Sequence, residues 1–91
     1  MGKYNESIQA YESVLKINPK FAQAWNYKGI ILMNLNRTNE AIDAFSNATT
    51  SDPSFAEAWN NLGLTLNAVG RYKDAINAFD KAIEAKSANQ F

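Results

Sequence analysis

Few side chains in this chain of 91 residues are suited to acid-base or nucleophilic chemistry. Cysteine and histidine are absent, which excludes thiol nucleophiles, imidazole catalysis, disulfides and nearly every zinc or copper site. Carboxylates, lysines and tyrosines remain, and the closest acidic pair is Glu40 with Asp43, one turn apart on a predicted surface helix. Such a pair needs a pocket to act as general acid and base. We therefore expect a solvated helix surface, no metal or other cofactor, and no enzymatic activity.

The charge balance excludes two classes of partner. Nine basic residues balance nine acidic ones, so charge draws the protein neither to phosphate backbones nor to anionic lipid. The longest apolar run, around Ile30 to Met33, is far shorter than a membrane span, and the first residues lack the layout of a signal peptide. We expect a cytoplasmic protein that binds neither nucleic acid nor membranes.

One stretch of the sequence occurs twice. Residues 22–29, AQAWNYKG, return 34 residues later as AEAWNNLG in 56–63, and the same offset relates Phe45 to Phe79. Residues 1–19 align with the second half of such a unit. A period of this length is typical of repeat proteins, in which each unit stacks on its neighbours.

Helical periodicity and helix breakers divide the chain into five predicted helices. Pro19 and Pro53 interrupt the pattern at equivalent places, because proline cannot extend the preceding hydrogen-bond ladder. Asn36 and Gly70 occupy equivalent tight turns, which require a residue that tolerates left-handed dihedral angles. The predicted helices are Lys3 to Ile17, Ala22 to Leu35, Thr38 to Thr50, one that begins at Ala56, and Tyr72 to Ala85, followed by a loose tail from Ser87 to Phe91.

Small and aromatic residues indicate how these helices pack. We expect Gly29 to face Ala41 and Ala48 across a pair of antiparallel helices, so that the backbones approach closely. We expect Trp25 and Trp59 to be largely buried, each against the phenylalanine of its own helix pair. The second helix of each pair is amphipathic, and its predicted inward side chains are Ala41, Ile42, Phe45 and Ala48, then Ala75, Ile76, Phe79, Ala82 and Ile83.

The order of tryptophan, leucine-glycine, aromatic, alanine, phenylalanine and proline resembles the tetratricopeptide repeat (TPR) family. The residues that carry it are Trp25, Gly29, Ala41, Phe45 and Pro53, then Trp59, Leu62, Gly63, Ala75 and Phe79. The resemblance implies an all-α protein, an α-α superhelix (TPR solenoid) of five helices that forms a single domain. It comprises one half-repeat in 1–21 and two full helix-turn-helix repeats in 22–55 and 56–89. Lys28 stands where the family usually has leucine, so we expect its stem to be buried and its head solvated.

In TPR proteins the first helix of each unit lines a concave face, where ligand peptides usually lie. The resemblance therefore implies a scaffold whose concave face binds a peptide or helix of another protein, with asparagine amides bonding an extended backbone and Leu64 among the apolar contacts. The alternative is that these are ordinary surface residues without a ligand. The clamp that holds chaperone C-termini is incomplete, since Asn26 and Ile30 stand where it has a lysine and an asparagine. The residues carried over by position are Gln23, Asn26, Tyr27, Ile30, Met33, Asn34, Glu57, Asn60, Asn61, Leu64 and Asn67.

Two other interpretations stay open. The chain is either a structural self-assembly unit, a closed two-fold homodimer formed through exposed solenoid ends, or a fragment of a longer TPR array, since it begins within a repeat. Self-association is expected because the first helix lacks the partner that precedes it in a full unit, and the last helix lacks a capping helix. The residues expected to take part are Tyr4, Ile8, Tyr11, Leu15 and Ile83.

Overall fold

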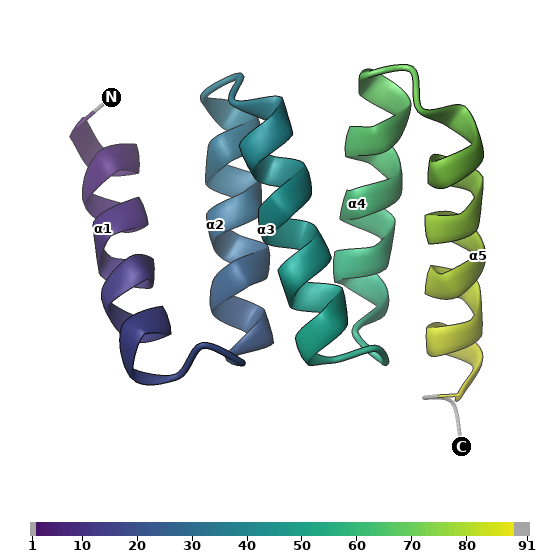
Figure 1. Cartoon of the computed structure of the whole chain (residues 1–91), viewed down its shortest axis with the longest axis horizontal. Helices are drawn as coiled ribbons and strands as arrows, with labels where there is room; N and C mark the ends of the chain where they lie inside the picture. Colours follow the sequence, from purple (N-terminus) through teal and green to yellow (C-terminus); the bar gives the residue numbers. More distant parts are fainter. Residues whose placement is uncertain (1, 89–91) are drawn as a thin grey trace.

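The computed structural model describes residues 2–88, which form five helices and no strand, as predicted (Figure 1). Each helix contacts its neighbours in sequence, and α2 also contacts α4. The fifth helix runs past its predicted end to Ala88, so the expected tail is in part helical; residues 89–91 lie outside the described residues. The helices are α1 (Gly2–Ile17), α2 (Ala22–Asn34), α3 (Thr38–Ser51), α4 (Ala56–Ala68) and α5 (Tyr72–Ala88).

The turns that end α2 and α4 have the backbone geometry predicted for them. Asn36 has a φ of 61° and Gly70 a φ of 84°. After α2, the backbone N–H of Arg37 donates to the carbonyl of Leu32 at 2.8 Å, and the turn after α4 has the same pattern. This closure satisfies the last carbonyls of each helix and reverses the chain within three residues, which places α3 and α5 antiparallel to the helices before them.

Close approach within each helix pair depends on a glycine that faces an aromatic ring. A Cβ atom added to Gly29 would lie 2.5 Å from Cε1 of Phe45, and one added to Gly63 would lie 2.7 Å from Cε1 of Phe79. The nearest neighbour of Gly29 is therefore the ring of Phe45, not Ala41 or Ala48 as expected. The phenylalanine ring fills the space that the missing Cβ leaves, which is why glycine and phenylalanine recur together.

The tryptophans are half-buried rather than largely buried. The indole N–H of Trp25 donates to the backbone carbonyl of Pro19, and that of Trp59 to the carbonyl of Pro53, both at 2.8 Å. Each indole thus ties its helix to the loop before it. Because these prolines are exposed, one edge of each indole stays at the surface while the rest packs against the core.

The core is continuous from α1 to α5, and α3 contributes its most deeply buried ring, that of Phe45. The prediction for α5 was only partly right, because Ala75 is buried but Ile76 and Ile83 are exposed. The reason is positional. The corresponding side of α3 is covered by α4, whereas no described helix packs on the outer side of α5, the side away from α4 (Figure 1). No helix in residues 2–88 has the length and apolarity needed to cross a membrane.

Candidate protein-binding face

The exposed residues of α2 and α4 form one stripe on each helix, and we call the two stripes together the α2–α4 face. Their helical spacing places the members of each stripe on one side, and the two helices contact each other. Tyr27 and Leu64 are the large apolar members, with 48% and 50% of their surface exposed. The exposed residues of the face are Gln23, Tyr27, Asn34, Glu57, Asn60, Leu64 and Asn67.

Asn26 does not belong to this face, contrary to the sequence-based expectation. Its side chain is 1% exposed, and its Oδ1 accepts a hydrogen bond from Nδ2 of Asn61 at 3.0 Å. An amide buried among apolar side chains needs such a partner. The pair therefore joins α2 to α4 inside the interface and leaves Asn61 only part-exposed for a ligand.

The predicted apolar floor is also partly used by the fold itself. Ile30 and Met33 are half-buried and pack against the core. The hydroxyl of Thr65 donates to the carbonyl of Asn61 at 2.7 Å and lies 3.0 Å from Sδ of Met33. Met33 is therefore held against α4, and only part of its surface is left to a ligand.

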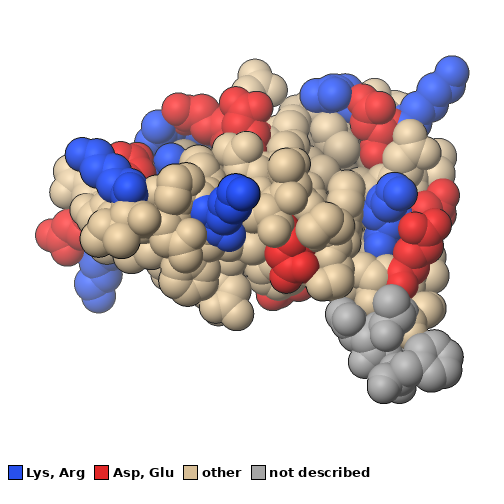
Figure 2. Space-filling model, turned by 60° about the horizontal axis from the view of Figure 1, so that its bottom comes forward, with Lys and Arg blue, Asp and Glu red and all other residues tan. Residues whose placement is uncertain are grey.

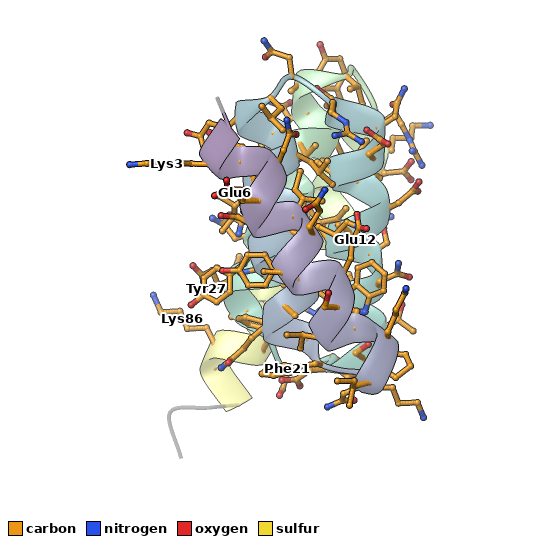
Figure 3. The ribbon with its side chains drawn as sticks, turned by 90° about the vertical axis from the view of Figure 1, so that its left-hand side faces the viewer. Lys3, Glu6, Glu12, Phe21, Tyr27 and Lys86 are labelled. Carbon is orange, nitrogen blue, oxygen red and sulfur yellow. The ribbon has the colours of Figure 1, made fainter. Side chains whose placement is uncertain are left out.

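A stacked tyrosine pair stands at the α1 end of the face. The rings of Tyr11 and Tyr27 lie 5.8 Å apart between centroids with an interplanar angle of 24°. In Figure 3, Tyr27 points to the same side of the molecule as Lys86, whereas Glu12 points to the opposite side. Stacking restricts the Tyr27 ring, so it presents a preorganised aromatic surface.

Charge contributes little to the α2–α4 face, on which Glu57 is the one ionised member. Elsewhere among the described residues, four ion pairs are formed, Lys28–Glu12, Arg37–Glu40, Arg71–Asp74 and Lys81–Glu84. Figure 2 shows basic and acidic groups interspersed with uncharged surface. Lys28, expected to extend into solvent, is instead held 3.7 Å from Glu12 and 5.3 Å from the ring centroid of Trp25. The Lys28 side chain as a whole is 20% exposed, and its ammonium forms an ion pair and a cation–π contact.

The acidic pair considered for catalysis is divided between two environments. Glu40 accepts hydrogen bonds from the guanidinium of Arg37, which lowers the pKa of Glu40 and raises that of Arg37. Asp43 is exposed. Among the described residues, no three His, Cys, Asp or Glu side chains come together closely enough to hold a metal ion.

An apolar hollow of about 600 Å³ lies between α4 and the outer side of α5. Two residues that line it, Glu57 and Asn60, were predicted to lie on the concave face. Phe79, Ala82 and Ile83 were predicted to lie inside, and no place was predicted for Ala56 and Lys86. Ile83 is exposed because α4 is the one described helix that packs on α5, and the lack of a capping helix had predicted this. We call this feature the α5 hollow, and it is lined by Ala56, Glu57, Asn60, Phe79, Ala82, Ile83 and Lys86.

The residues expected to mediate self-association differ in how far their side chains are exposed. Ile8 and Leu15 are 6% and 7% exposed, so the prediction that they have an open side was wrong, because the packing of α1 on α2 covers them. Tyr11 is half-buried against Tyr27. Tyr4 and Ile83 are exposed as expected.

Sequence profiles of repeat families match the chain over almost its whole length. A profile described as "Tetratricopeptide repeat" matches residues 28–90, and one described as "TPR repeat" matches residues 1–36. No curated protein sequence matches the chain significantly.

Solved structures share the fold. The crystal structure of MamA superposes with a TM-score of 0.91 at 23% sequence identity and covers 97% of this chain and 52% of that chain. MamA AMB-1 superposes with a TM-score of 0.81 at 29% sequence identity and covers 91% of this chain and 49% of that chain. The second TPR of Spaghetti (RPAP3), bound to the HSP90 peptide SRMEEVD, superposes with a TM-score of 0.85 at 19% sequence identity and covers 92% of this chain and 78% of that chain. The chain thus spans about half the length of the MamA chains it matches.

Proposed function

The chain belongs to the tetratricopeptide repeat family, and we propose that it is a scaffold that binds a peptide or helix of another protein along the α2–α4 face. The observation that carries the proposal is the exposure of Tyr27, Asn60 and Leu64 on two helices that contact each other. We assign the repeats to residues 22–55 and 56–89, after half a repeat. A cytoplasmic location and the lack of enzymatic activity stay predictions.

The chemistry of the face selects an extended or helical segment with little charge. Asn34 and Asn60 offer amide donors and acceptors that can pair with a backbone, and Tyr27 and Leu64 offer apolar area. With Glu57 as its one ionised member, the face has no cation for an acidic peptide to pair with. One similar structure holds an HSP90 peptide that contains two glutamates and an aspartate. That resemblance supports peptide binding in general, and we do not extend the acidic ligand to this chain.

The test compares two double variants in a pull-down from the source cell. Tyr27→Asp with Asn60→Glu alters the face at two exposed positions on different helices. We expect captured partners to be lost, because two carboxylates would oppose a neutral or apolar ligand. Asn26 is not suitable for this test, since a charge at a buried position would unfold the protein.

The matched control is Asn47→Glu with Asn77→Glu, which adds the same two charges at exposed positions on α3 and α5. Both variants should keep the helical circular dichroism of the parent. Retention of the partner by the face variant, or equal loss from both, would place the site elsewhere.

A homodimer that forms when no partner is present is the second candidate. The observation that favours it is the apolar stripe of Tyr72, Ile76 and Ile83 on α5, each with 59–64% of its surface exposed. A two-fold contact would bury the same stripe from both copies. Sedimentation velocity over a concentration series tests this, and a species of 10.1 kDa at every concentration would exclude it.

A further inference from the structure

The stacked rings of Tyr11 and Tyr27 bring two phenols together across α1 and α2. Their centroids lie 5.8 Å apart and their planes are inclined by 24°, so the π system of one ring faces that of the other. Tyr27 has 48% of its surface exposed, and Tyr11 is half-buried. A reagent in solution can therefore reach the pair through Tyr27.

The packing of the repeats does not account for two phenols at this junction. The offset of 34 residues relates Tyr11 to Phe45, and Phe45 to Phe79. Phenylalanine thus fills the place of Tyr11 in both later helices without a hydroxyl group. The same offset relates Tyr27 to Asn61, which has no ring. The paired phenols therefore give the α1–α2 junction a chemistry that the equivalent positions lack.

Adjacent phenols can be joined by oxidation. A one-electron oxidant removes an electron and a proton from each phenol, which leaves a radical shared between the oxygen and the ring carbons ortho and para to it. The para carbon of tyrosine carries the side-chain stem, so two such radicals form their new bond between ortho carbons, Cε to Cε. Each bonded carbon then releases its proton and each oxygen regains one. Overall two hydrogen atoms are lost, and one hydrogen peroxide molecule that accepts them is reduced to two water molecules.

We propose that Tyr11 and Tyr27 are a site of oxidative modification, at which a haem peroxidase with hydrogen peroxide couples the two side chains into dityrosine. The bond would hold α1 on α2, the one helix within residues 2–88 that α1 contacts. The chain contains no cysteine, so it has no thiol of its own to reduce the radicals before they couple. Coupling requires no ligand on the α2–α4 face.

The test treats the dilute, purified chain with a haem peroxidase and hydrogen peroxide. It is repeated in a Tyr72→Phe background, because Tyr72 is 62% exposed and would couple one copy to another. We expect a monomeric product that has dityrosine fluorescence and has lost two hydrogen atoms by mass spectrometry. After digestion with trypsin, which cuts after lysine and arginine, the fragment of residues 4–16 should be joined to that of residues 21–28.

Tyr11→Phe and Tyr27→Phe should each abolish the joined fragment. Phenylalanine keeps a ring for the stack but cannot form the radical, so both variants should fold, which circular dichroism checks. The matched control is Tyr4→Phe, which changes the other tyrosine of fragment 4–16, 39% exposed, and should leave the yield unchanged. Absence of the joined fragment from the parent, or its persistence in Tyr27→Phe, would overturn the proposal.

Hydrogen exchange measured by mass spectrometry tests whether the bond holds α1 in place. Amide exchange within α1 should slow at least about tenfold after coupling, because a cross-link that closes a loop of about 16 residues restricts the detached state. Tyr27→Phe treated with the same oxidant should show no slowing, which separates the bond from other oxidation products. Equal exchange in the coupled and untreated parent would contradict the role of the bond in holding α1.

Discussion

Replacing each of the two helical glycines by alanine tests whether the ring opposite controls the packing. In both cases the new Cβ would overlap the ring of a phenylalanine, at 2.5 Å for Gly29 and 2.7 Å for Gly63. The two rings differ in their freedom to move. Phe45 is 0% exposed within α3, between α2 and α4, whereas Phe79 is part-exposed on α5 beside the hollow.

The expected magnitudes follow from two opposing effects. Alanine is favoured over glycine in a helix interior by about 1 kcal/mol. Overpacking of a well-packed core costs about 1–3 kcal/mol. Gly29→Ala should bear most of the overpacking cost and lower the free energy of unfolding by about 1–2 kcal/mol. Gly63→Ala should come out within about 1 kcal/mol of neutral, because Phe79 can turn toward the hollow.

Urea unfolding followed by circular dichroism measures both changes. The substitution Phe45→Leu provides the internal control, since a shorter side chain should relieve the overlap and reduce the cost of Gly29→Ala by at least about 0.5 kcal/mol in a double-mutant cycle. If Gly29→Ala stabilised the protein, or if Gly63→Ala lowered the free energy of unfolding as much as Gly29→Ala does, the ring contact would not limit how closely the helices approach.

Three further outcomes are expected. Trp59→Phe should cost about 1 kcal/mol in urea unfolding, because it removes the indole hydrogen bond but keeps most of the packing, and a cost above about 3 kcal/mol would contradict this division. Asn26→Ala should cost about 1–3 kcal/mol because it removes a buried partner of Asn61, so a neutral result would show that the bond is not formed in solution. In a carbon-detected NMR titration, Glu40 should titrate below its ordinary pKa of 4.5, and Arg37→Gln should raise that value; the pair stabilises the fold above the ordinary pKa and this contribution is lost as pH falls through the lowered one. An identical midpoint in the parent and in Arg37→Gln would exclude the pair.

Local rules of helix formation account for the part of the fold that the sequence predicted. A left-handed residue at Asn36 and at Gly70, and a proline after α1 and α3, determine helix ends through backbone geometry alone. These effects are independent of distant contacts. The extension of α5 past Ala85 lies where Ser87 replaces the proline that follows α3, so no strong breaker ends the helix there.

Burial was harder to predict, because it depends on which neighbour covers a side chain. Ile42 and Ile76 have equivalent places in the repeat, yet only Ile42 is covered. Asn26 was assigned to the surface since asparagine is usually exposed, but a partner 35 positions along the chain makes its burial possible. Sequence periodicity identifies the side of a helix on which a residue lies. It does not tell whether that side faces another helix.

The buried amide pair of Asn26 and Asn61 explains why an apolar interface between repeats can be specific. Apolar contacts alone tolerate a shift of one helix along another, since the leucines recur at helical spacing. A shift by one turn would leave the amide of Asn26 buried without its partner, at a cost of about 1–3 kcal/mol. The pair therefore contributes to the register of α4 as well as to stability, as single polar residues define register in coiled coils.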